Sequence, residues 1–554
     1  MSLTNLGLAL AALVVASAAA MAAPQDDAAR TEQLISDAWR LKEKLRSDPH
    51  RPRYHFLPPM GWLNDINGAI HWKGRYHIFY QHNPDGGYWN RMQWGHASSV
   101  DLIHWVHHPI ALTPTPGGPD RDGCFSGGAF LSKEGVPTFI YHGVPDGTCL
   151  ATSTDDLLIH WTKHPANPVI RVPRPGDPGF GVYSVFDPCA WWSDGRYYAV
   201  EANTPFATPQ FGLTSTNEHR DPLGRILKPE ELGDTLYLFR SDDLVHWSYV
   251  APFYRARPRP TEDDEDCAVP DFFPLGNKHM LLFASHLAGT QYYLGRLEGE
   301  RFLPETHGRM NWQGGLLSGA RTLLDRRGRR VLFDWIGEHR GVPWERESGW
   351  SGVMTLPKLL SLSPRGDLRI EPAPELNALR YNHRRLQGIT AADAETVLKQ
   401  VRGDSLELSL TIDTGSAGQC GLKLRRSPDG AEQTEVLFDR AAATLTVVTR
   451  RSGHDARVTY PAYRFDGALA RLPEAKRFPG AQVAPLKLAR GEALRLRVYL
   501  DRSVLEVFAN GRQCITQRIY PTRPDSLGVA FFATDGAARI RTMDAWDMGP
   551  TNSE

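Results

Sequence analysis

The chain has 554 residues, more than one compact core usually holds, so we expect two or three domains. Lys and Arg together number 63, as do Asp and Glu, and this balance argues against nucleic acid or an anionic membrane as a partner. The 50 Gly, 41 Pro and 15 Trp residues favour many short strands joined by turns over a helical protein.

Residues 1–22 are predicted to be a secretory signal peptide. An apolar run from Leu6 to Ala23 ends in small residues, as at a cleavage site. Because no Lys or Arg precedes the run, an uncleaved membrane anchor is the alternative. No later apolar stretch reaches the roughly 18 residues that span a bilayer. We therefore expect an exported protein, periplasmic or extracellular, with no membrane span after signal cleavage.

A polar, helical leader is expected at residues 23–49, and an all-β pattern follows it. Residues 68–72 and 76–80 are short alternating segments on either side of a Lys-Gly turn, which indicates a hairpin. Segments of this kind, separated by Gly, Pro, Asp and Asn, continue to about residue 365.

An internal repeat indicates a radial arrangement of these strands. An Asp-Leu-…-His-Trp unit, preceded by Ser and polar residues, occurs at residues 101–105, 156–161 and 243–247. One turn-then-Trp unit recurring along a β-rich chain is typical of propeller blades. We interpret its histidines as turn or packing contacts, because they do not cluster at the spacing of metal ligands.

The pattern changes after a Pro-punctuated linker at residues 366–385. From 386 to 548, period-2 segments such as 406–412 and 494–500 predict antiparallel strands buried on one face, and hence a β-sandwich. The six cysteines allow 15 full disulfide pairings, and buried free thiols explain them equally well. They are Cys124, Cys149, Cys189, Cys267, Cys420 and Cys514.

The densest cluster of polar residues is Gly-Trp-Leu-Asn-Asp-Ile-Asn-Gly at residues 61–68. Asn amides can hold the carboxylate of Asp65 while both groups bind sugar hydroxyls. A turn that uses Asn, Asp and Gly for positive φ explains the same residues. Spacing alone leaves both interpretations open.

Several motifs, in order along residues 50–548, resemble those of glycoside hydrolase family 32, the invertases, inulinases and levanases. Residues 62–68 resemble the family's W-M-N-D-P-N-G. The later matches are Trp94-Gly95-His96 (W-G-H), Phe125-Ser126-Gly127 (F-S-G), Asp187-Pro188 (R-D-P), Pro270-Asp271-Phe272-Phe273 (E-C-P-D-F-F) and residues 501–508 (D-R-S-x-x-E-V-F).

The resemblance implies a five-bladed β-propeller (residues 50–365) followed by a β-sandwich (386–548), with a funnel-shaped site at the propeller axis. It implies retaining, two-carboxylate hydrolysis that needs no metal and no organic cofactor. By motif position Asp65 is the nucleophile and Asp187 stabilises the transition state. The positions that match the family's fructose pocket are Asn64, Gln81, Trp94, Phe125 and Ser126.

Two departures from the family pattern affect the site. The Arg of R-D-P is Phe186 here, so a guanidinium is lost. The family has a Glu directly before Cys-Pro-Asp. A gapless alignment on Pro270 places Ala268 at this position, so the Glu has no direct counterpart. A two-residue bulge would instead bring Asp266 or Glu265 into the role of acid/base, and the longer reach of Glu favours Glu265. A solvated acidic loop is the alternative for this run.

The sequence thus predicts an exo-acting β-fructosidase that releases terminal fructose from sucrose, inulin or levan. A fructosyltransferase of the same fold, a non-catalytic fructan-binding or sensor protein, and a propeller used for protein contacts are the alternatives. The expected partner is a small or polymeric fructose-containing carbohydrate. The choice among these sugars and the oligomeric state stay open.

Overall fold

The computed structural model describes residues 24–203, 235–255, 267–286, 288–462, 469 and 472–551. The predicted signal peptide lies outside this range. Helix α2 (Pro24–Ser47) confirms the helical leader and forms a unit separate from residues 49–554, which are considered on their own below. No helix in the described ranges is long and apolar enough to cross a membrane.

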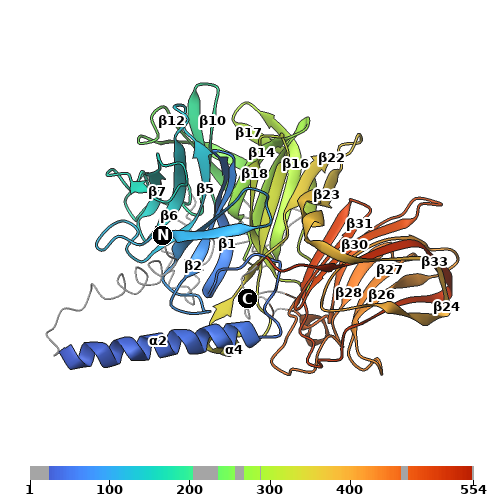
Figure 1. Ribbon diagram of the computed structural model, residues 1–554. Helices are drawn as coiled ribbons and strands as arrows, with labels where there is room; N and C mark the ends of the chain where they lie inside the picture. Colours follow the sequence, from blue (N-terminus) through green and yellow to red (C-terminus); the bar gives the residue numbers. More distant parts are fainter. Residues whose placement is uncertain are drawn as a thin grey trace. The chain divides into compact units, whose positions relative to one another are not determined.

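Five sheets in the described residues form the blades of a β-propeller (Figure 1). The first contains β1 (Gly61–Trp72), β2 (Arg75–Asn83), β3 (Gln93–Ser99) and β4 (Trp105–Leu112), with β20 (Trp350–Ser351) beside β1. The second contains β5 (Gly123–Leu131), β6 (Pro137–Val144), β7 (Gly147–Thr152), β8 (Thr162–Lys163) and β9 (Ile170–Arg171). The third contains β10 (Cys189–Ser193), β11 (Arg196–Glu201), β12 (Thr235–Ser241) and β13 (Ser248–Arg255).

The fourth sheet contains β14 (Ala268–Leu275), β15 (Lys278–Ser285), β16 (Gly289–Glu298) and β17 (Arg301–Arg309). The fifth contains β18 (Leu317–Leu324), β19 (Arg330–Ile336), β21 (Val353–Met354), β22 (Lys358–Leu362) and β23 (Leu368–Pro372), and helix α4 (Val342–Ser348) lies in the connection after β19. Strand β23 lies beyond residue 365, where we expected the propeller to end, because its Ile-Glu-Pro segment still pairs with β22.

The first strands of the five sheets form a closed ring about the propeller axis. In ring order β1 contacts β5, then come β10, β14 and β18, which contacts β1 again. The connection after β19 joins the last blade to the first, because β20 runs parallel to β1 and Gly61 N–H donates to the Gly349 carbonyl over 2.9 Å.

The Asp-Leu-…-His-Trp repeat is a turn between the third and fourth strands of the first three blades. The carboxylates of Asp101 and Asp243 each accept two backbone N–H groups and the imidazole N–H of the His three residues later. In the second copy Asp155, one position earlier than expected, takes this role because the copy has an extra residue. The interpretation of these histidines as turn contacts is therefore supported.

The C-terminal domain is a ten-stranded β-sandwich. Its strands are β24 (Arg380–Arg402), β25 (Ser405–Asp413), β26 (Gln419–Arg426), β27 (Thr434–Asp439), β28 (Thr444–Val448), β29 (Ala481–Pro485), β30 (Leu494–Asp501), β31 (Val504–Ala509), β32 (Gln513–Arg518) and β33 (Gly528–Met548). A 3-10 helix, η2 (Pro374–Leu379), precedes them, and α6 (Glu474–Arg477) lies before β29. The long β33 pairs with β24 on one side and with β26 and then β25 on the other, which joins the two layers.

The D-R-S-x-x-E-V-F segment attaches the sandwich to the propeller. Asp501 accepts the backbone N–H groups of residues 53–55 and the Nδ1 of His55 at 2.7–2.9 Å. Glu506 accepts Nε2 of His55 and forms a fully buried ion pair with Lys358 at 2.7 Å. Strand β31 is therefore buried on both faces rather than on one, because its second face meets the propeller.

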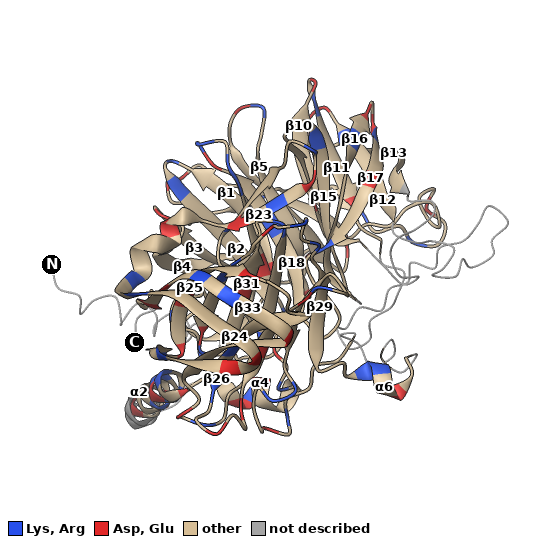
Figure 2. Cartoon of the chain, turned by 90° about the vertical axis from the view of Figure 1, so that its right-hand side faces the viewer, with Lys and Arg blue, Asp and Glu red and all other residues tan. Residues whose placement is uncertain are grey.

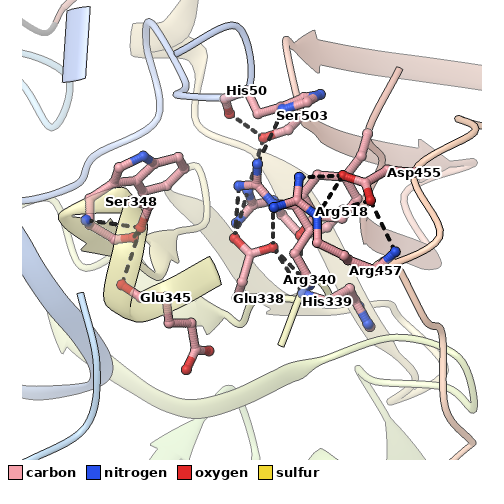
Figure 3. A network of polar contacts seen from close by, with 12 residues as sticks. His50, Glu338, His339, Arg340, Glu345, Ser348, Asp455, Arg457, Ser503 and Arg518 are labelled. Atoms are coloured by element: carbon pink, nitrogen blue, oxygen red, sulfur yellow. Dashed lines mark hydrogen bonds and ion pairs between the residues drawn. The ribbon is translucent and has the colours of Figure 1, made fainter. Parts of the chain in front are cut away.

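A second buried polar network joins the same two domains (Figure 3). Glu338 of the last blade accepts Nε of Arg340 at 2.9 Å and lies 3.4 Å from Arg518 of the sandwich. Arg518 donates to Ser503, whose hydroxyl donates to the His50 carbonyl. Burial alone would raise the pKa of Glu338, but the two guanidinium groups lower it to about 2.

Charges of both signs are interspersed over the described strands of the two domains (Figure 2). All six cysteines are buried free thiols in the structure, which agrees with the second interpretation of the cysteine pattern, free thiols rather than disulfides. In the described part of the chain, no group of three or more His, Cys, Asp and Glu side chains is placed to hold a metal ion.

Candidate functional site

Beta-bulges at one end of the ring of first strands build the candidate site. The pairing register slips in β1 between Leu63 and Ile66, in β5 between Cys124 and Gly127, in β14 after Ala268 and in β18 after Ser318. Each slip lies opposite the last residues of the second strand of its blade, so all four lie at the same end of the ring. Bulges re-aim side chains, which is why they are frequent beside active sites.

Three of these bulges converge on Asp65. Asp65 lies in the bulge of β1 and is partly exposed. Ser126, in the bulge of β5, donates its hydroxyl to Oδ2 of Asp65 over 2.7 Å. Gly319, in the bulge of β18, has φ +74, and a Cβ at this position would lie 2.7 Å from Cγ of Asp65. The carboxylate is thus oriented by one neighbour and confined by another.

The first strands of the third and fourth blades, β10 and β14, meet at Asp187. This residue precedes β10, is buried, and has the left-handed φ of 42° that non-Gly residues seldom adopt. The backbone N–H of Val269, in the bulge of β14, donates to its Oδ2 over 3.3 Å. Arg321 of β18 donates to the carbonyls of Pro188 and Pro270, which ties these two strands to the strand that confines Asp65.

The structure places the predicted pocket residues around the two bulges that carry Asp65 and Ser126. Asn64 is buried and accepts the indole N–H of Trp62 at 2.6 Å. Gln81 donates to the Cys124 carbonyl and Trp94 donates to the Phe125 carbonyl, both over 3.0 Å. Trp94 is fully buried, so it supports the bulge of β5 rather than forming pocket surface as the resemblance implied.

An aromatic wall lies where the family motif has its arginine. The ring centroid of Phe186 is 5.0 Å from that of His142, which lies 6.3 Å from that of Phe125. Burial lowers the pKa of His142 to about 4, so the imidazole is neutral at neutral pH. The family's arginine position therefore holds an apolar ring beside a neutral imidazole here.

Two buried carboxyl groups that the sequence analysis did not single out lie behind the two aspartates. Asp334 accepts the hydroxyl of Thr290 at 3.1 Å; burial, with the charge of Asp65 as a lesser cause, raises the pKa of Asp334 to about 8. Glu201 ends β11, and burial raises its pKa well above the ordinary value. The only sequence signal for Glu201 is an acid that closes the apolar strand Tyr-Tyr-Ala-Val.

The predicted acid/base residues, Glu265 and Asp266, lie outside the described residues, so their role stays a prediction. The chain beside them is irregular as that prediction requires: Cys267 and Val269 both have φ 49°, and β14 carries a bulge. Ala268, which a gapless alignment would place at the acid position, is buried and has no proton to donate.

One cavity, of about 280 Å³, lies between the propeller and the sandwich. It is lined by Ala288, Arg309, Trp312, Gln313, Ala462, Pro479, Ala481 and Val483. Trp335 is fully buried in the propeller core, in ring contact with Trp62, so it cannot serve as a platform for a sugar.

Comparison with known proteins gives a consistent result. The family described as glycosyl hydrolases family 32 N-terminal domain matches residues 55–213 and 226–372, and its C-terminal counterpart matches residues 375–547. The sucrose-6-phosphate hydrolase of Zymomonas mobilis is 29% identical, over 92% of this chain and 94% of that protein. The levanase of Bacillus subtilis is 28% identical, over 90% of this chain and 70% of that protein. The crystal structure of fructan 1-exohydrolase IIa from Cichorium intybus has a TM-score of 0.74 and 24% identity, over 91% of this chain and 98% of that one.

Proposed function

The chain belongs to glycoside hydrolase family 32, and on that premise we propose that it releases terminal fructose from sucrose or a fructan with retention of configuration. The chain is a glycoside hydrolase of the fructosidase family. The observation that carries the finer proposal is the convergence of three bulged strands on Asp65, a partly exposed carboxylate at the bulged end of the ring.

Asp65 is the proposed nucleophile. Its carboxylate attacks the anomeric carbon of the fructosyl unit as the bond from that carbon to the leaving oxygen breaks, which yields a fructosyl ester of Asp65. The hydrogen bond from Ser126 to Oδ2 and the contact of Gly319 with the carboxylate fix its direction, so little orientational freedom is lost at the moment of attack.

A second carboxyl group must give the leaving oxygen a proton and then take one from the attacking water. We assign this role to Glu265, with Asp266 as the alternative, on the motif position. Water then cleaves the ester and frees fructose and Asp65. Asp187 is proposed to bind fructose hydroxyls and to stabilise the charge that develops on the ring; the N–H of Val269 holds one of its oxygens.

The test is release of fructose from sucrose, inulin and levan by the purified protein, with the first anomer of the product observed by NMR. We expect fructose from at least one of the three sugars, appearing first as the β-anomer. The α-anomer first would exclude the retaining mechanism. Transfer to a second sugar in place of water would identify a fructosyltransferase, and binding with no release would identify a binding protein.

We also propose that the protein is exported, on the apolar run that ends near Ala23. The measurement is the N-terminal sequence of the protein recovered outside the cytoplasm. A mature chain that begins after the small residues 20–23 is expected. A full-length chain retained in the membrane fraction would support the uncleaved anchor instead.

A further inference from the structure

Glu201 is a buried glutamate at the end of β11 that the proposed reaction does not use. Its side chain is fully buried. Oε1 forms a hydrogen bond with the hydroxyl of Thr148 at 2.6 Å, and Oε2 accepts the backbone N–H of Phe186 at 3.1 Å. Both oxygens of the acid therefore hold neighbouring parts of the chain, one in the second blade and one directly before Asp187.

The end of β11 holds Phe186 from two sides. Besides the bond from Phe186 N–H to Glu201, the N–H of Ala202 donates to the Phe186 carbonyl over 2.7 Å. The next residue, Asp187, has φ 42°, a left-handed conformation that is strained for an L-residue and persists only when its surroundings impose it. Fixing Phe186 on both sides is a direct means of imposing it.

Burial is the largest cause of the raised pKa of Glu201, and it outweighs the hydrogen bonds from Thr148 and Phe186, which lower that pKa. Among the described residues, the charge that acts on it is that of Asp187, which is negative. The titratable groups on the strands around it are Tyr237 on β12, Cys189 on β10, Cys149 on β7 and, beyond Phe186, His142 on β6. Burial keeps both thiols and the imidazole uncharged at neutral pH, so none of them offsets a charge on Glu201.

We propose that Glu201 is a positioning residue that fixes the backbone of Phe186 and thereby holds the Asp187 carboxylate in place. The inference rests on the proposed role of Asp187 in binding fructose and stabilising the transition state. An ionised Glu201 would place a second negative charge behind Asp187, and the two negative charges would repel each other.

Three variants test the positioning. In Glu201→Ala the N–H of Phe186 loses its acceptor, and we expect kcat to fall about 100-fold with KM changed less than about threefold, as for a misplacement on the order of 1 Å. Glu201→Gln keeps an acceptor for this N–H and should retain kcat within about threefold. Glu432→Ala is the matched control, because Glu432 is a buried glutamate of the sandwich that accepts the N–H groups of Thr522 and Arg523. It should lose stability and keep kcat. An unchanged kcat in Glu201→Ala, or an equal loss in Glu201→Gln, would overturn the proposal.

The charge state is tested by unfolding across pH, which needs no activity. An acid whose pKa is raised on folding stabilises the protein below its ordinary value, here 4.5, and that stability is lost as pH rises toward the folded pKa. Relative to Glu201→Gln, the wild-type unfolding constant should therefore rise tenfold, or about 1.4 kcal/mol, per pH unit above about 4.5. A difference that does not vary with pH would refute the uncharged form.

The two readouts separate failure of this inference from failure of the proposed function. A wild-type protein that releases no fructose from any of the three sugars removes the premise for kcat but leaves the pH slope measurable. A flat pH slope in a protein that does release fructose refutes Glu201 alone.

Discussion

Asp65 and Glu506 are acidic residues in the two most conspicuous motifs of the chain, and their surroundings differ. Asp65 is partly exposed, and Ser126 donates the hydrogen bond that the structure gives its carboxylate. Glu506 is fully buried, and donors surround both of its oxygens. These donors are the Nε2 of His55, the backbone N–H of Leu356, Nζ of Lys358 and the hydroxyl of Thr516.

The difference teaches how to separate a reactive carboxylate from a structural one. A carboxylate has about four lone-pair sites, and those of Glu506 are occupied by these donors, three of which come from the propeller. Asp65 accepts the hydrogen bond from Ser126 and keeps lone-pair sites available for the substrate proposed for it. The two motifs are equally prominent in the sequence. A motif match cannot separate the two carboxylates, because it does not show how many hydrogen-bond donors surround each one.

The largest effect that would break this comparison is expected from Asp65→Asn. The amide keeps the size of the side chain but is a far weaker nucleophile, so kcat for fructose release should fall by at least about 10⁴-fold. The Tm should stay within about 2 °C, because the site is partly exposed and no buried pair is lost. Asp85→Asn, an exposed aspartate in the turn after β2, is the control and should keep kcat. Comparable activity in the two variants would exclude Asp65 as the nucleophile.

Glu506→Ala is expected to show the opposite behaviour. The substitution leaves Lys358 and His55 buried without their partner, which costs about 3–5 kcal/mol of unfolding free energy. Denaturant unfolding measures this loss, and kcat per folded molecule should stay within about threefold of wild type, because Glu506 meets no substrate. A large fall in kcat at unchanged stability would place Glu506 in the catalytic machinery and end the comparison.

How much of the fold the sequence predicts depends on how local its signals are. The hairpin of β1 and β2 and the strands β25 and β30 follow from period-2 patterns. The repeat marks only three blades, because its turn needs an Asp that caps backbone N–H groups and a left-handed Leu, as at Leu102 and Leu244. In the last two blades the third and fourth strands are joined by turns at Gly299 and Gly366 instead, so the repeat does not mark them. The expectation of five blades therefore came from the resemblance.

The site divides in the same way. Asp65 and Asp187 belong to motifs and were predicted from the sequence. Gly319 and Asp334 were not, because they lie in the last blade and approach Asp65 of the first. Glu201 was not either, because it reaches Phe186 from the next strand of the third blade. No local pattern reports a contact between bulges that are brought together only when the ring closes. For the same reason the burial of β31 on both faces was missed, since its second partner is the propeller.

Gly319→Ala sharpens the claim that Asp65 is confined as well as reactive. The new Cβ would overlap the Asp65 carboxylate at a position with φ +74, so the carboxylate must move; we expect kcat to fall about 100-fold. Gly328→Ala is a matched control, because Gly328 has φ +72 and open space around it. It should cost about 1 kcal/mol of stability, as a strained alanine does, and leave kcat unchanged. Equal kinetic effects would mean that backbone strain, not contact with Asp65, is responsible.

The smallest effect is expected from Ser126→Ala, which removes the hydrogen bond to Oδ2 of Asp65 and leaves the carboxylate in place. A hydrogen bond to a charged group contributes about 1.5–3 kcal/mol, and part of it is regained from water at this partly exposed site, so kcat should fall about tenfold. Ser132→Ala, which removes a hydroxyl from the turn at the far end of β5, is the control and should keep kcat. If Ser126→Ala matched Asp65→Asn instead, the hydroxyl would itself take part in the reaction, and Asp65 would no longer stand apart from Glu506 as the carboxylate with free capacity.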